Sequence, residues 1–157
     1  MTSLRGAVAD ADSITQYLEN SLKVGKSRIR NIRNAEATRA AIISAFIALE
    51  NHPEIGLGDP ILIYYAGHGA SVKPPIGWEA GGAGRIQMLI PHDYHTDGVQ
   101  GIPDRTISVL LTRLAKAKGD NIVRLCTSFS LFSSSDFETD CHIRLLSLWL
   151  RHTQRLD

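Results

Sequence analysis

One histidine stands in a setting suited to acid–base chemistry. His68 follows the strongly hydrophobic stretch Ile61–Tyr65, and Gly67 and Gly69 flank it. Flanking glycines free the backbone and leave an imidazole sterically open. Because an imidazole titrates near neutral pH, His68 is a candidate general acid and base. A histidine in a tight turn that follows a strand is the alternative interpretation of this short motif.

Two cysteines are the candidate nucleophiles. Cys126 ends a short apolar stretch from which its thiol could approach His68, whereas a cysteine inside such a stretch is usually inert core. Cys141 lies in the sequence Asp-Cys-His but has no apolar strand before it. Of the two, Cys126 is the better placed for nucleophilic catalysis.

Acidic residues indicate a functional site less clearly than His68 and the two cysteines do. Asp10 precedes a helical pattern, where a lone Asp is most often an N-cap, and Asp93 follows Pro91, where it suits a turn. Asp93 also belongs to a small cluster with His92, His95 and Asp97. No second cluster at zinc-ligand spacing accompanies it, so we expect a solvated loop and no metal or other cofactor.

Length and composition limit the classes of protein to which the chain can belong. The 157 residues suit one domain, and a formal net charge of +1 argues against a nucleic-acid surface or a polybasic membrane patch. The longest apolar run, residues 40–49, is shorter than the roughly 20 residues that span a bilayer. Two cysteines do not make a disulfide framework. We therefore expect a cytoplasmic globular domain that binds neither nucleic acid nor membrane.

Hydrophobic periodicity predicts alternating helices and strands. Helices are expected at 10–22, at 34–51 with Asn34 as the cap, and at 103–118 before Gly119. Strands are expected at 61–65, 86–90 and 121–126, and residues 26–33 form at most an edge strand. This alternation favours an α/β sandwich with a mainly parallel sheet. A surface loop is expected at 71–85, and an apolar helix at 142–151 that docks on the sheet or drives self-association.

Several motifs in order resemble the caspase/metacaspase superfamily, particularly its fungal metacaspase-like members. The strand 61–65 leads into a Tyr-x-Gly-His-Gly motif, and a P-x-D motif follows the next predicted strand. The family's L-x-G-x-x-x-D-A element also matches. The matched positions are Leu4, Gly6, Asp10, Ala11, Tyr65, Gly67, His68, Gly69, Pro91 and Asp93.

The resemblance implies a three-layer fold and a cysteine endopeptidase that cuts peptide or protein substrates after Arg or Lys. His68 would be the catalytic histidine, and a backbone N–H near Gly69 would stabilise the oxyanion. Asp10 and Asp93 would lie in the substrate-binding region. A calcium requirement is common among metacaspases, but no loop of oxygen ligands is assignable in this sequence.

Two departures from the family pattern predict an incomplete domain. Members begin with an apolar strand before the L-x-G element, and they carry Asp-Cys-Cys-His-Ser-Gly after the strand that follows the third helix. Here residues 124–130 replace that motif, and counting along the pattern places the nucleophile near Phe129, three residues beyond Cys126. We therefore predict a partial caspase-like domain at 4–123 that lacks the first strand and the C-terminal half, followed by a divergent tail at 124–157. An inactive fragment that serves as a binding or regulatory module is the alternative.

Overall fold

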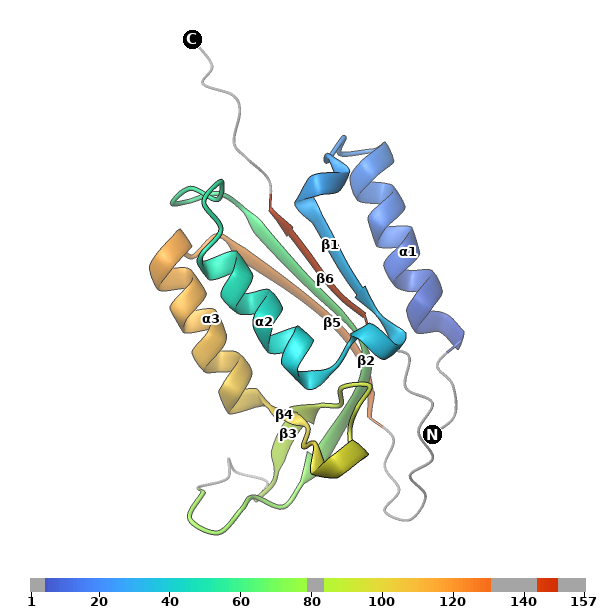
Figure 1. The fold of residues 1–157 in the computed structure, drawn as a ribbon, viewed down its shortest axis with the longest axis vertical. Helices are drawn as coiled ribbons and strands as arrows, with labels where there is room; N and C mark the ends of the chain where they lie inside the picture. The colour runs from blue at the N-terminus through green and yellow to red at the C-terminus, as the bar shows by residue number, and fades with distance from the viewer. Residues whose placement is uncertain (1–4, 79–83, 131–143, 150–157) are drawn as a thin grey trace.

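A computed structural model describes residues 5–78, 84–130 and 144–149 (Figure 1). Three helices occur in these ranges: α1 (Arg5–Asn20), α2 (Arg39–Glu50) and α3 (Asp104–Lys118). Short 3-10 turns lie at Lys26–Arg28, Asn34–Glu36 and Thr96–Gly98. The strands are β1 (Ile29–Arg33), β2 (Ile61–Val72), β3 (Ile86–Leu89), β4 (Ile102–Pro103), β5 (Ile122–Ser130) and β6 (Arg144–Trp149).

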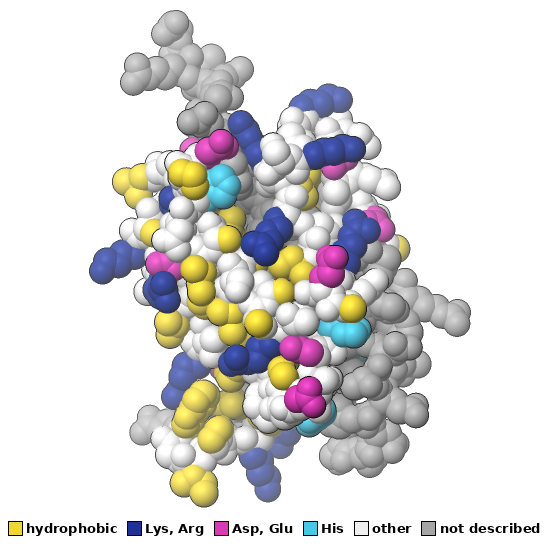
Figure 2. Space-filling view, in the orientation of Figure 1, with side chains coloured by type: hydrophobic (Ala, Val, Ile, Leu, Met, Phe, Trp, Pro, Cys, Tyr) yellow, Lys and Arg dark blue, Asp and Glu magenta, His cyan; other side chains and the backbone are white. Residues whose placement is uncertain are grey.

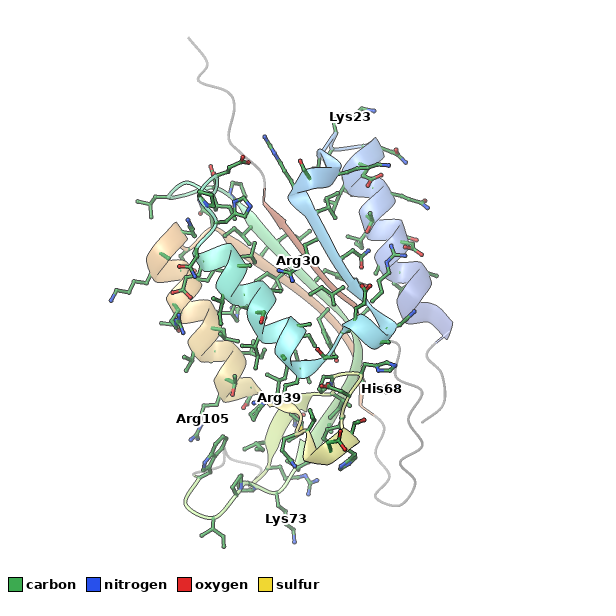
Figure 3. All side chains as sticks on the ribbon, viewed as in Figure 1. Lys23, Arg30, Arg39, His68, Lys73 and Arg105 are labelled. Carbon is green, nitrogen blue, oxygen red and sulfur yellow. The ribbon has the colours of Figure 1, made fainter. Side chains whose placement is uncertain are left out.

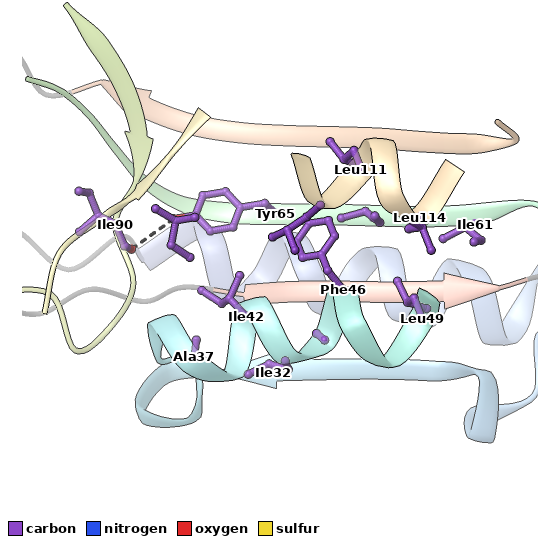
Figure 4. Close-up of a cluster of buried hydrophobic side chains, with 14 of the residues drawn as sticks. Ile32, Ala37, Ile42, Phe46, Leu49, Ile61, Tyr65, Ile90, Leu111 and Leu114 are labelled. Carbon is purple, nitrogen blue, oxygen red and sulfur yellow. Dashed lines mark hydrogen bonds between the residues drawn. The ribbon is translucent and has the colours of Figure 1, made fainter. Parts of the chain in front are cut away.

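Helices cover both faces of the sheet because β2 is apolar on both sides. Successive strand side chains point to opposite faces, so Ile63 and Tyr65 pack in one core and Tyr64 and Ala66 in another. The first core holds buried side chains of α2 and α3 (Figure 4), and the second holds those of α1. The three-layer α/β expectation is confirmed.

The sheet is mixed rather than mainly parallel. Its order is β1-β6-β2-β3-β4, and β5 pairs with the other edge of β2. Among the described strands β2 and β5 run parallel, whereas the remaining pairs are antiparallel. The expected predominance of parallel pairing is therefore wrong. The reason is that β3 folds back on β2, and β6 enters the sheet against the direction of β1 and β2.

The C-terminal strand β6 fills the space between β1 and β2. Its backbone is in register with Ile29–Arg33 on one side and with Ile61–Ala66 on the other. Without it, two strands would face each other with unpaired N–H and C=O groups, which is costly away from water. The helix expected at 142–151 is wrong for residues 144–149, and residues 142, 143, 150 and 151 lie outside the described part. The gap expected between β1 and β2 is therefore not present, because β6 pairs with both strands.

Helix α2 begins later than expected. Thr38 is its N-cap, since its Oγ1 accepts a hydrogen bond of 3.1 Å from the N–H of Ala41. Asn34 instead starts a 3-10 turn at a positive φ of 47°.

None of the helices in the described ranges is both long and apolar enough to cross a membrane. Figure 2 shows hydrophobic and charged side chains interspersed over the face that α2 and α3 cover.

Two further boundaries differ from the sequence prediction. β2 continues through Gly67, His68 and Gly69 to Val72, because β3 and β5 pair with this extension. The glycines therefore lie inside a strand and not in a turn. Helix α1 begins at Arg5, so Asp10 lies inside it as an exposed residue and is not its N-cap.

We predict that the stability of the domain depends on β6. Removing residues 141–157 deletes a strand that has five register pairs with β1 and six with β2. At about 1 kcal/mol net per backbone hydrogen bond, the free energy of unfolding should fall by several kcal/mol. Urea unfolding followed by circular dichroism measures this loss.

The matched control removes residues 151–157 and keeps β6. It should unfold at a urea concentration close to that of the full chain. Equal unfolding midpoints for the two truncated chains would show that β6 contributes nothing to the fold.

Candidate active site

His68 lies inside β2 and is fully buried, with 0% of its surface exposed. The expected sterically open imidazole is therefore wrong in this structure. Burial lowers the pKa of His68 below its ordinary value of 6.5, because the charged form loses its hydration. Among the residues that the structure describes, neither ring nitrogen has a hydrogen-bond partner. The side chain is thus neutral at pH 7, the form that a general base requires.

The backbone of His68 is held by two donors. The Tyr65 hydroxyl donates a hydrogen bond of 2.8 Å to the His68 carbonyl oxygen, and the N–H of Ile90 donates one of 3.0 Å to the same oxygen. The hydroxyl also lies 3.3 Å from the Ile90 carbonyl oxygen (Figure 4). The sequence analysis places Tyr65 in the strand and in the family motif but assigns no hydrogen bond to its hydroxyl. The sequence could have indicated this role, because the hydroxyl of a buried tyrosine needs a hydrogen-bond partner.

Asp93 ties the segment after β3 to the start of α2. Its Oδ1 accepts a hydrogen bond of 2.8 Å from the N–H of Arg39, and the N–H of His92 donates one of 3.0 Å to the Ala37 carbonyl. Asp93 therefore satisfies one of the unpaired N–H groups at the N-terminus of α2. Arg39 and His68 lie at the same end of the sheet (Figure 3). The substrate-binding role expected for Asp93 stays a prediction.

The two candidate acidic residues belong to different layers. Because β2 alternates regularly, the His68 side chain faces the same layer as Tyr64 and Ala66, which is the layer of α1. Asp10 is in α1 and so shares that layer with His68, whereas Asp93 is bonded to α2. The structure thus places Asp10, and not Asp93, on the face of the sheet that holds the imidazole.

The parallel pairing of β2 and β5 fixes which residue of β5 accompanies His68. His68 is in register with Phe129, and Cys126 is in register with Tyr65. At a rise of about 3.3 Å per residue, the backbone of Cys126 lies about 10 Å back along the strand from that position. Cys141 lies outside the described residues. The described strands therefore do not bring Cys126 and His68 together.

The expected oxyanion donor also lies within the sheet. Gly69 is in register with Leu89 of β3 on one side and with Ser130 of β5 on the other. Its backbone is therefore engaged in strand pairing rather than at a free turn. The oxyanion role of Gly69 stays a prediction.

The residues around Asp93 form a tight loop. His95 has a positive φ of 67°, and its ring lies 3.8 Å from that of Tyr94, centre to centre. Within the described ranges, no group of three or more His, Cys, Asp or Glu side chains is arranged to hold a metal ion.

Comparison with known proteins gives one match. A family model described as the caspase domain matches residues 1–115, which is most of the chain. No curated protein and no solved structure matches.

We predict that the burial of His68 makes stability depend on pH. The pKa of His68 is lowered in the folded chain, so between pH 7.5 and 5.5 the unfolded chain takes up more of a proton at position 68 than the folded chain does. Stability is therefore lost as pH falls below 6.5, by at most about 1.4 kcal/mol at pH 5.5. Urea unfolding of the wild type and of His68→Gln at both pH values isolates this contribution. An equal pH dependence for the two proteins would contradict it.

We further predict that Asp93 contributes to stability through α2. Asp93→Ala should lower the free energy of unfolding by about 1 kcal/mol, as loss of a helix cap does. Asp93→Asn keeps an oxygen acceptor and should lose less. Asp120→Ala, a change at an exposed aspartate, is the control and should leave the unfolding midpoint unchanged. If the Asp93→Ala and Asp120→Ala proteins unfolded alike, the bond to Arg39 would not stabilise the fold.

Proposed function

The chain belongs to the caspase-domain family, and from that membership we propose that it is a cysteine-peptidase-like domain with an incomplete catalytic pair. The chemistry that the resemblance implies is hydrolysis of peptide bonds after Arg or Lys. In this chain the histidine of the catalytic pair, His68, is present, and the cysteine, Cys126, is displaced from it along the strand. The domain then acts as a binding or regulatory module rather than as a working peptidase.

The chemistry of the family sets a strict requirement on geometry. The imidazole takes the proton of the thiol, the thiolate attacks the scissile carbonyl carbon to form an acyl-enzyme, and the amine leaves with that proton; water then releases the acyl group. The sulfur and the ring nitrogen must approach to about 3 Å, directly or on substrate binding. A thiol that is held several ångströms away cannot begin the cycle.

The register of β5 against β2 is the observation that carries the proposal. It pairs His68 with Phe129 and places Cys126 at the level of Tyr65. This register favours the incomplete pair over an active enzyme that uses Cys126.

A basic substrate residue would be recognised by Asp10. Its carboxylate is exposed on α1, in the layer that His68 faces, and it carries the charge that a guanidinium or ammonium group binds. Binding of a basic peptide without cleavage would thus be a residual property of the module. The competing proposal, an active peptidase, requires Cys126 or Cys141 to reach His68.

We predict that an acyloxymethyl-ketone probe carrying Arg does not label the wild-type chain. Phe129→Cys places a thiol at the position in register with His68, so it should gain labelling. The rate should exceed that of Thr127→Cys, the matched cysteine two positions earlier, by at least about tenfold, because reaction depends on proximity to the base. Mass spectrometry of the labelled peptide identifies the modified residue.

His68→Ala added to Phe129→Cys is the control, and it should abolish the gained labelling. Stoichiometric labelling of Cys126 or Cys141 in the wild type, lost in His68→Ala, would instead show a competent catalytic pair and overturn the proposal.

A further inference from the structure

The segment that contains β1 concentrates positive charge. Residues 23–33 hold five Lys and Arg and neither Asp nor Glu, although the whole chain has a formal net charge of only +1. Arg33 pairs with Asp12 of α1 at 2.7 Å. Lys26 and Arg30 are exposed, and among the described residues no carboxylate pairs with either of them. Because like charges that lie near each other repel, an anion that binds both cations would be stabilised.

A groove of about 460 Å³ separates this segment from helix α2. Arg30 lies on the same face of β1 as the buried Ile32, and it extends toward α2 (Figure 3). The groove is lined by three cations and by apolar residues, among them Lys26, Arg28, Arg30, Ile29, Ala48 and Leu49. None of the described residues that line it is Asp or Glu. Its volume falls in the range of ligand-binding clefts, which is roughly 300–1,000 Å³.

We propose that this groove binds an acidic segment of a partner protein. Carboxylates of the segment would pair with Lys26 and Arg30, and an apolar side chain between them would pack against Ala48 and Leu49. Charge-assisted bonds between a guanidinium and a carboxylate are stronger than neutral ones and add geometric specificity. The groove is separate from the candidate active site, because α2 covers one face of the sheet, whereas His68 faces the layer of α1 on the other.

A peptide fits the groove better than a nucleic acid or a membrane does. Nucleic acids are bound by extended basic surfaces and by aromatic side chains that stack on bases. The net charge of +1 provides no extended basic surface, and no Phe, Tyr or Trp is among the described residues that line the groove. A flat anionic membrane would contact the exposed Lys26 and Arg30 but would not reach Leu49, which is 6% exposed.

Fluorescence anisotropy of a synthetic acidic peptide tests the role of the two cations. The probe is a fluorescein-labelled peptide of six Glu residues with two Leu residues at its centre, and the protein is the full chain. Arg30→Glu should raise the dissociation constant at least about tenfold, because it replaces an attraction with a repulsion. Lys26→Glu should give the same loss, so the result does not depend on how one variant folds.

Lys73→Glu is the matched control for both charge reversals. It changes the net charge by the same amount, at an exposed residue that does not line the groove. It should bind the peptide like the wild type, with circular dichroism showing that all three variants are folded. Higher salt should weaken binding to the wild type, because mobile ions screen exposed charges.

The same measurement tests the apolar contact. A peptide with two Gly residues in place of the two Leu residues should bind at least about tenfold more weakly, since it buries no apolar side chain in the groove. Polyuridylate, a polyanion without aliphatic side chains, should compete less well than the unlabelled Leu peptide at equal concentration of negative charge.

Three results would overturn this proposal: no saturable binding of the Leu peptide up to about 1 mM, equal binding by Arg30→Glu and Lys73→Glu, or equal competition by polyuridylate. A dissociation constant above about 1 mM is weaker than a specific peptide site requires.

A segment of the same chain is the alternative occupant of the groove. β6 ends beside the start of β1, since Leu148 is in register with Ile29, and residues 151–157 follow shortly after it. The chain that lacks residues 151–157 should bind the Leu peptide like the full chain. Binding at least about tenfold tighter would show that those residues occupy the groove and would contradict the proposal. None of these readouts uses position 129 or a probe that carries Arg, so the groove and the proposed function fail separately.

Discussion

The backbone of β2 needs a strand on each side, and the rest of the structure follows from that need. β2 is a twelve-residue strand buried on both faces, so water reaches few of its N–H and C=O groups. An unpaired backbone group in such a place costs about as much as a lost hydrogen bond. β5 takes one edge of β2, and β6 and β3 share the other in succession. The helices then cover the two apolar faces that this arrangement creates.

The same pairing determines the chemistry that the site can support. Continuous pairing carries β2 past Gly67 and Gly69, which buries His68 and lowers its pKa. It also fixes Phe129 as the β5 residue beside His68. The bonds of Tyr65 and Asp93 hold the neighbouring segment in place. The pairing therefore places the histidine of the family motif and Cys126 at different levels of the sheet.

The sequence predicts the features that local patterns determine. The apolar stretch Ile61–Tyr65, the buried stripe of α2 and the stripe of α3 are confirmed, because burial follows the strand and helix periods directly. Local patterns fail where pairing across the sheet decides the outcome. Glycines at 67 and 69 indicate a turn, yet β3 and β5 extend the strand through them. Likewise the apolar residues of β6 do not lie on a single face of a helix. The segment forms a strand because it pairs with β1 on one side and with β2 on the other. The motif locates His68, but contacts such as Asp93 to Arg39 join residues too distant in sequence for any local signal.

The register between β5 and β2 is the central claim, and a nuclear Overhauser spectrum of the isotope-labelled chain tests it most directly. Backbone protons of paired residues in neighbouring strands lie close enough to exchange magnetisation. The account predicts cross-peaks that connect the backbone of Phe129 with that of His68 and the backbone of Cys126 with that of Tyr65. Cross-peaks that connect Cys126 with His68 would contradict it, because the thiol would then lie beside the imidazole.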